Sequence, residues 1–313
     1  MQQTLKKEII FNGIGLHSGK PVTMRVSPAS ENTGILLTRS DVDDSLNTIE
    51  AKWNHVVPSE LCTLLAWQGA NGEKITISTI EHILSALRGA NIDNAHITLD
   101  GPEVPIMDGS AIEFFTEIEK TGVQTQSAPT KYIRVLKEVR YEEGDKYAVL
   151  KPSTIPTFRF DLDFDAPAIG EQTFEAALVN GYYKHDIASA RTFCTLDTVD
   201  AMRERGLALG GSLENAVVVD GEKVMNPEGF RFENECARHK TLDAIGDLYL
   251  AGAPILGAFH GYKAGHAMHT ALLRELFADE SNYEVVNGAI DDLPAIKTFH
   301  QEPTQRQHVS ASA

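Results

Sequence analysis

The sequence of this 313-residue chain predicts an α+β fold. Segments whose apolar residues alternate, as they do in strands, occur together with segments of helical spacing in both the N-terminal and the C-terminal parts of the chain. Several predicted strands are joined by short turns such as VDGEK (219–223), which is typical of hairpins rather than of a regular β-α-β alternation. The length also allows two domains, each with a core of its own.

A polar segment, QTQSAPT (124–130), is the best candidate for a linker because it contains a proline and lacks hydrophobic periodicity. It divides the chain into a first domain, residues 1–126, and a second domain, residues 131–299. The final residues, HQEPTQRQHVSASA (300–313), have almost nothing apolar to bury, so we expect them to form a mobile tail.

The individual elements follow from the periodicity. In the first domain we expect strands at KPVTMRVSP (20–28) and NAHITLD (94–100) and a helix at TIEHILSALRGA (79–90). In the second we expect strands at KYIRVLKEV (131–139), TFRFDLDF (157–164) and NAVVVDGEKV (215–224), and helices at TVDAMRERG (198–206) and ECARHKTLDAIGDLYLAG (235–252). EHILSALRGANIDNAHI and RHKTLDAIGDLYLAGAPI each place a histidine at the second position of a helix that ends near Gly-Ala, which is weak support for a duplication.

The composition narrows the function classes. A formal net charge of −16 argues against nucleic acid as a partner, because phosphate backbones require clustered Lys and Arg. The longest apolar stretch, LYLAGAPILGAF (248–259), is too short for stable insertion into a membrane. Three widely spaced cysteines do not suggest a disulfide framework. We therefore expect a cytoplasmic protein.

The predicted helix at 235–252 carries an unusual group of ionisable residues. His239 and Asp243 are four residues apart, so both side chains project from one helix face and could bind one metal ion. Asp247 lies one turn further along that face. Taken alone, the spacing is more typical of an exposed His–Asp pair. Cys236 is a rival, softer metal ligand, although a free cysteine is more often a small buried hydrophobe.

A third ligand is offered by STIEH (78–82), which has two interpretations. Ser78 and Glu81 have the spacing of a capping box, which would make Glu81 a helix cap. Alternatively, His82 is a metal ligand and Glu81 is the base that activates a water molecule. The local pattern alone favours the capping box.

Two further motifs contain a histidine between or after glycines. GIGLHSG (13–19) is followed by a strand pattern, so it lacks the helix N-terminus that a dinucleotide-binding loop requires. YKAGHAMH (262–269) places His266 after a glycine at a strand-to-helix transition, a position suited to a cleft, although an ordinary cap or surface histidine would fit the same pattern.

Taken together, six motifs in this order resemble one family. They are GIGLHSGKPV, STIEH, GPEVPIMDGSA (101–111), SARTF (189–193), LGGSLENAVVVD (209–220) and RHKTLDAIGDL (238–248). The chain resembles the zinc-dependent UDP-3-O-acyl-N-acetylglucosamine deacetylases, which act in lipid A (lipopolysaccharide) biosynthesis of Gram-negative bacteria. The similarity extends from residue 13 to about residue 275.

This resemblance implies two similarly folded domains, each a sheet layered with helices, with the active site at their interface. It implies one Zn²⁺ per chain, with Fe²⁺ as the alternative in the cell, bound by His82, His239 and Asp243. The other catalytic positions it implies are Glu81 as general base, His266 as a second acid/base or electrostatic group, Asp247 as the partner that orients it, and Thr192 as oxyanion donor.

The same resemblance implies the substrate-binding residues. They are Lys240 and Lys263 for the diphosphate, Leu16, His17 and Cys62 beside the site, and Phe193, Leu196, Val199, Gly211, Ser212 and Val218 for an acyl-chain passage. A plainly packed helix and strand would explain the same apolar residues. Two positions depart from the family pattern: Cys236 replaces a usual aromatic residue, and Ala166 replaces a common histidine.

The predicted activity is hydrolysis of the N-acetyl group of UDP-3-O-(3-hydroxyacyl)-N-acetylglucosamine, with release of acetate. The predicted partner is therefore a small-molecule substrate, and we expect a monomer. The alternatives are a zinc hydrolase of other specificity and a non-catalytic UDP-sugar binding module on the same fold.

Overall fold

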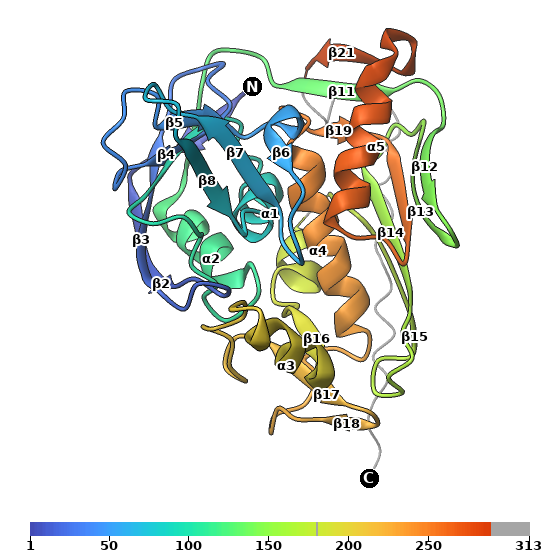
Figure 1. Ribbon diagram of the computed structural model, residues 1–313. Coiled ribbons are helices and arrows are strands. Elements are labelled where there is room, and N and C mark those ends of the chain that lie inside the picture. The colour runs from blue at the N-terminus through green and yellow to red at the C-terminus, as the bar shows by residue number, and fades with distance from the viewer. Residues whose placement is uncertain (180, 289–313) are drawn as a thin grey trace.

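The chain forms two main sheets with helices between them (Figure 1). A computed structural model describes residues 1–179 and 181–288. The blue strands of the N-terminal half lie on one side in Figure 1, and the green strands of the C-terminal half lie on the other. The predicted α+β class, with helices layered on sheets, is confirmed.

The first half contains a five-stranded sheet. Its strands, in spatial order, are β2 (Ile9–Ile14), β3 (Pro21–Pro28), β9 (Ala95–Leu99), β4 (Ile35–Arg39) and β5 (Thr48–Glu50). The β9–β4 pair is parallel and the other pairs are antiparallel. Helices α1 (Glu81–Gly89) and α2 (Ile112–Thr121) contact each other, and α2 contacts β2. The short strands β1 (Gln3–Leu5) and β10 (Val123–Thr125) pair antiparallel.

The second half repeats this plan. Its five strands are β12 (Val139–Glu143), β13 (Lys146–Lys151), β20 (Ala258–Tyr262), β14 (Thr157–Asp163) and β15 (Glu171–Ala177). Here the β20–β14 pair is parallel and the others are antiparallel. Helices α4 (Glu235–Tyr249) and α5 (His266–Ala278) pack on this sheet. Strand β11 (Lys131–Val135) pairs with β19 (Ile255–Leu256) and β21 (Tyr283–Asn287).

The two five-stranded sheets have the same order and the same pattern of strand directions, so the similarity between the halves extends to their topology. Helices α1 and α4 occupy equivalent places, each preceding the central strand of its sheet. One detail of the predicted repeat is wrong: His82 is the second residue of α1, but His239 is the fifth residue of α4 because that helix begins at Glu235.

Each half carries a different insertion before its first long helix. The first has the 3₁₀ turn Trp53–His55 and a small sheet of β6 (Val56–Val57), β7 (Leu64–Gln68) and β8 (Lys74–Ser78). The second has a π-helical turn, Tyr183–Ile187, followed by β16 (Phe193–Thr195), α3 (Leu196–Glu204), β17 (Val217–Asp220) and β18 (Lys223–Val224). The first insertion thus ends immediately before α1 and the second ends shortly before α4.

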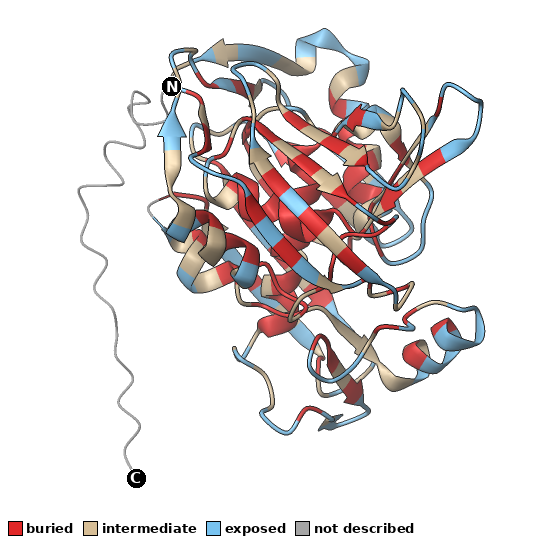
Figure 2. Ribbon diagram, turned by 90° about the vertical axis from the view of Figure 1, so that its left-hand side faces the viewer, coloured by how far each residue is buried: buried red, intermediate tan, exposed pale blue. Residues whose placement is uncertain are grey.

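The seam between the halves is formed by α1 packed against α4. Every residue of α1 from Glu81 to Arg88 is buried, and α4 is buried along most of its length, as the red helices of Figure 2 show. A Cβ at Gly246 would lie 2.0 Å from the Glu81 carbonyl oxygen, so glycine permits this close approach. Most polar side chains on these two helices therefore face protein and not bulk water.

Several boundaries differ from the predictions. KYIRVLKEV is divided between β11 and β12. The predicted linker 124–130 begins inside β10, and Gln126 donates a hydrogen bond to the Ala29 carbonyl, so the connection is attached to the first half. The 300–313 tail and the end of the second domain, 289–299, lie outside the described residues. Among the helices that the structure describes, none is both long and apolar enough to cross a membrane.

Candidate metal centre and active site

Three predicted ligands from both halves meet in the seam. The first turn of α1 supplies His82, and two successive turns of α4 supply His239 and Asp243. The Asp243 Oδ1 atom lies 3.3 Å from His239 Nε2 and 3.6 Å from His82 Nε2. The candidate donor atoms all lie within 4.8 Å of one another. The interpretation of His239 and Asp243 as an exposed surface pair is wrong, because each is only 2% exposed.

The chemistry of these three residues fits a divalent metal such as zinc. Asp243 Oδ1 is buried and has no hydrogen-bond partner among the described residues, which is costly unless a cation binds it. His239 Nδ1 donates to the Ala190 carbonyl at 3.0 Å, which leaves Nε2 as the free lone pair. Burial lowers the pKa of His239 to about 3, so the imidazole is neutral, as a metal ligand must be.

Asp243 remains ionised despite its burial. Burial alone would raise the pKa of its carboxyl, but the positive charge of the adjacent Lys240 holds that pKa well below the ordinary value. The Lys240 ammonium donates to Asp243 Oδ2 at 2.8 Å, so Oδ1 is the oxygen that faces the two imidazoles. Cys236 is fully buried, burial raises its thiol pKa to about 12, and it is not among the three converging residues.

Glu81 does not form a capping box. The N-terminal cap of α1 is Ile80, and the Ser78 hydroxyl donates to the Pro102 carbonyl. The Glu81 carboxylate instead accepts a hydrogen bond from the Thr63 backbone N–H at 3.1 Å. Burial raises the pKa of Glu81, which brings this carboxyl toward the range of a general base at neutral pH.

A second cluster lies beside Glu81. His266, the first residue of α5, donates through Nδ1 to Asp247 Oδ2 at 2.7 Å. Its Nε2 atom lies 3.9 Å from both Glu81 Oε1 and Asp243 Oδ2. Burial alone would lower the pKa of His266, but the carboxylates of Asp247 and Glu81 raise it to about 9. The imidazole is therefore held as a cation that faces the metal ligands.

Asp247 is the centre of this second cluster. It accepts a hydrogen bond from His269 Nδ1 at 2.8 Å and one from the Thr63 hydroxyl at 2.5 Å, in addition to that from His266. Burial would raise the pKa of Asp247, but the adjacent histidines lower it. The carboxylate is thus fully occupied by donors and is suited to orienting His266.

The segment 189–193, which contains Thr192, contacts the candidate metal ligand His239. Ala190, two residues before Thr192, accepts the His239 hydrogen bond, and the ring of the following residue, Phe193, lies edge-on to the His239 ring at 6.3 Å. The Thr192 backbone N–H donates to the Gly109 carbonyl, and its own carbonyl accepts from Val217. The segment is therefore attached to both halves next to the candidate metal centre.

The two lysines predicted for the diphosphate differ in their surroundings. Lys240 is paired with Asp243 inside the site. Lys263 follows β20 in a left-handed conformation with φ of +51°, and its ammonium is paired with Asp163 at 2.7 Å and with Asp145 at 3.2 Å. These hydrogen bonds raise the pKa of Lys263, so it presents a permanent positive charge.

The residues predicted to flank the site connect the loop 13–19 to the second insertion. The Leu16 carbonyl accepts from Gly210 N–H at 3.0 Å, which places Leu16 beside Gly211. His17 is buried, neither of its ring nitrogens has a hydrogen-bond partner within residues 1–179 and 181–288, and burial lowers its pKa. Cys62 is also buried, and burial raises its thiol pKa to about 12.

The predicted passage residues lie on the second insertion, where they make several kinds of contact. Val199 is buried in a small apolar cluster with Met202 and Ala208, and Val218 packs against that cluster. Leu196 begins α3, and Ser212 donates through its backbone N–H to Asn215. These contacts describe a packed unit beside the site; an acyl passage along it remains a prediction.

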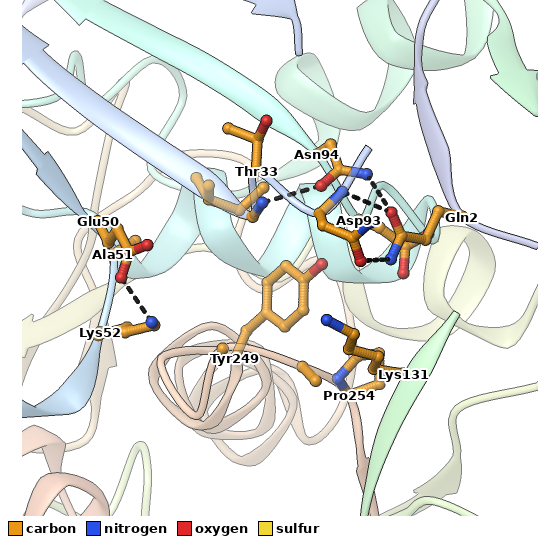
Figure 3. A pocket seen from close by; sticks show the side chains of 15 residues that line it. Gln2, Thr33, Glu50, Ala51, Lys52, Asp93, Asn94, Lys131, Tyr249 and Pro254 are labelled. Carbon is orange, nitrogen blue, oxygen red and sulfur yellow. Dashed lines mark hydrogen bonds and ion pairs between the residues drawn. The ribbon is translucent and has the colours of Figure 1, made fainter. Parts of the chain in front are cut away.

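A separate cavity of about 160 Å³ lies near the C-terminal ends of α1 and α4 (Figure 3). It is lined by both halves and contains none of the predicted site residues. Its polar groups pair with the protein itself: Asp93 accepts from Gln3 N–H, and Lys52 pairs with Glu50. This cavity therefore does not carry the chemistry described above.

Four residues at the site escaped the sequence analysis. His269 lies one turn after His266 on α5, a spacing that puts both on one helix face and could have revealed it. Arg191 and Glu235 form a buried ion pair, 2.9 Å from Nε to Oε1, which attaches segment 189–193 to the start of α4. Thr63 contacts both Glu81 and Asp247. A threonine within LCTLL carries no local signal beyond that of a strand.

A buried set of candidate metal ligands, flanked by a buried carboxylate and by an imidazole paired with a second carboxylate, is the arrangement expected of a metal-dependent hydrolase. Comparison with known proteins identifies which one. The model of the LpxC family, described as UDP-3-O-acyl N-acetylglycosamine deacetylase, matches residues 2–278. The chain belongs to this family.

Individual relatives agree with this assignment. A UDP-3-O-acyl-N-acetylglucosamine deacetylase from Shewanella violacea is 45% identical over 288 residues, which cover 91% of this chain and 92% of the relative. A protein with the same name from Acidithiobacillus ferrooxidans is 46% identical over 290 residues, covering 92% of this chain and 93% of the relative. The family match over residues 2–278 spans both halves and the positions of all the candidate site residues.

Proposed function

We propose that this chain hydrolyses the N-acetyl group of UDP-3-O-(3-hydroxyacyl)-N-acetylglucosamine and releases acetate, in lipid A biosynthesis. The observation that carries the proposal is the convergence of His82, His239 and Asp243 beside Glu81 and His266. The named activity of the relatives supports the choice of substrate.

The metal in this proposal is one Zn²⁺ per chain, held by His82, His239 and Asp243. Two imidazoles and one carboxylate are a donor set that zinc accepts at catalytic sites, where a fourth position stays open. When bound, zinc would supply a Lewis acid that lowers the pKa of water and polarises the amide carbonyl. Fe²⁺ is the alternative ion in the cell.

The protein residues divide the proton transfers between them. Glu81 takes a proton from water as the oxygen adds to the acetamide carbonyl. The Thr192 hydroxyl donates to the oxyanion that forms, a contribution typically worth about 10²–10³ in rate. When the C–N bond breaks, His266 or protonated Glu81 gives a proton to the departing amine, and Asp247 holds His266 in its charged form. The products are acetate and the free amino sugar.

The remaining predicted residues bind the rest of the substrate. Lys240 and Lys263 supply positive charge for the diphosphate, and Leu16, His17 and Cys62 flank the site. The second insertion, with Phe193, Leu196, Val199, Gly211, Ser212 and Val218, offers apolar surface for the acyl chain. The proposal also includes a cytoplasmic monomer whose domains are residues 1–126 and 131–299.

One experiment tests the proposal and separates it from its alternatives. Purified protein should contain about one zinc ion and release acetate from the acylated UDP-sugar. Glu81→Ala should bind the same substrate with nearly unchanged affinity while turnover falls by orders of magnitude. A zinc-loaded wild-type protein that binds the sugar without releasing acetate would identify a binding module. Equal turnover of a substrate without the acyl chain would indicate a different specificity.

A further inference from the structure

Thr63 lies at the boundary between the two clusters of the site. It precedes strand β7 in the insertion of the first half and is 1% exposed. Its carbonyl accepts a hydrogen bond from Thr79 N–H at 3.0 Å, two residues before Glu81. The Thr63 backbone is therefore fixed to the turn that begins α1.

Two groups of Thr63 contact two different carboxylates. Its backbone N–H donates to Glu81 Oε2 at 3.1 Å, and its hydroxyl donates to Asp247 Oδ1 at 2.5 Å. The hydroxyl must be the donor, because an ionised carboxylate only accepts. Thr63, a residue of the first half, thus contacts both Glu81 on α1 of the first half and Asp247 on α4 of the second half.

These contacts determine which oxygen of each carboxylate faces the reacting groups. With Glu81 Oε2 occupied by Thr63, Oε1 is the oxygen that lies 3.9 Å from His266 Nε2. With Asp247 Oδ1 occupied, Oδ2 accepts from both His266 and His269. The β-branched threonine side chain has few rotamers, so its hydroxyl direction is well defined once the backbone is fixed.

We propose that Thr63 is a positioning residue that aligns Glu81 and His266 across the seam by holding Glu81 Oε2 and Asp247 Oδ1. This inference rests on the proposed function, because it assigns Thr63 a part in the proton transfers of that reaction. Thr63 itself does not contact the reacting atoms. Its side chain acts through Asp247 and its backbone acts through Glu81.

Substitution of the side chain tests the proposal with zinc-loaded protein and the acylated UDP-sugar. Thr63→Val keeps the shape and removes the hydroxyl, and Thr63→Ala and Thr63→Ser differ from each other only by that hydroxyl. A hydrogen bond to a charged group corresponds to about tenfold to a hundredfold in rate. We expect kcat to fall by that factor in Thr63→Val and Thr63→Ala, with KM and zinc content unchanged. Thr63→Ser should retain most of the wild-type kcat.

A matched control addresses stability. Thr4 is another buried threonine, whose hydroxyl donates to the Asn94 carbonyl at 2.7 Å away from the site. Thr4→Val should lower the melting temperature without lowering kcat. Equal kcat in Thr63→Ala and Thr63→Ser would overturn the positioning role, even if Thr63→Val failed to fold.

A second measurement does not depend on turnover. In ¹⁵N-histidine NMR spectra of the zinc-loaded protein, the Nδ1–H signals of His266 and His269 report their shared contact with Asp247. They should shift in Thr63→Ala and remain near wild-type positions in Thr63→Ser. Unchanged signals in both variants would contradict the inference. Shifted signals in a protein whose wild type releases no acetate would refute the proposed function and leave the contact itself established.

Discussion

The two halves have the same topology, but they contribute different parts of the site. Helix α1 has 9 residues and places Glu81 and His82 at its first turn. Its counterpart α4 has 15 residues and places His239, Asp243 and Asp247 at successive turns. In the proposed reaction the first half therefore supplies the base and one metal ligand, and the second half supplies two metal ligands and the acid partner. The repeated topology brings the equivalent helices α1 and α4 together. The functional groups that each helix contributes depend on its own sequence and not on the shared topology.

This division predicts that neither half holds the metal alone. His82→Ala and His239→Ala should each lose zinc and nearly all activity. The loss should exceed the tenfold to hundredfold effect that is usual for removing a residue that only supports a ligand. Zinc content by elemental analysis, together with acetate release, measures both. His96→Ala, in strand β9 of the first half, is the control and should keep its metal. Full zinc content in either ligand variant would mean that one half suffices.

Substitution of Glu81, the proposed base in the first half, should lower kcat without changing zinc binding. Glu81→Gln keeps the size of the side chain but cannot accept a proton, so kcat should fall by about 10²–10⁴ while zinc content is maintained. Steady-state kinetics and metal analysis check this. Glu119→Gln removes an exposed carboxylate of the first half that pairs with Lys184 of the second half, and this variant should behave like wild type. A small effect in Glu81→Gln would assign the proton transfer elsewhere.

The insertion of the second half is attached to α4 by a buried ion pair, and its loss should appear as lost stability. Arg191→Met leaves the buried Glu235 carboxylate without its partner, which typically costs about 3–5 kcal/mol. Urea unfolding of wild type and variant measures the change in the free energy of unfolding. Arg25→Met breaks an exposed pair with Glu8 and should change stability far less. Equal losses of unfolding free energy in Arg191→Met and Arg25→Met would show that the buried Arg191–Glu235 pair does not stabilise the attachment of this insertion.

The sequence could predict the parts of the site that have local periodicity. Spacing on α4 put His239 and Asp243 on one face, and the family motifs added Glu81, His82 and His266. It could not predict partners that meet only through the tertiary fold. Thr63 is 184 residues from Asp247 along the chain, and Arg191 is 44 residues from Glu235. The same limit explains why the capping box at Ser78 seemed the better local interpretation of Glu81.

The pH dependence of kcat/KM offers the finest test of the asymmetry between the halves. Activity should rise with pH as Glu81, whose pKa is raised by burial, loses its proton. It should fall again as pH passes about 9, where His266 becomes neutral. Asp247→Asn removes the nearest negative charge, so the pKa of His266 should fall and the basic limb should move to lower pH, by about one to three units.

The acid limb should move much less in Asp247→Asn, and in the same direction, because the Asp247 charge is a smaller influence on the pKa of Glu81 than burial is. The two limbs thus report separately on the two halves: the acid limb on a residue of α1, and the basic limb on the first residue of α5. An Asp247→Asn profile with an unchanged basic limb would show that His266 does not control it. The second half would then contribute only metal ligands, and the proton transfers would depend on Glu81 of the first half.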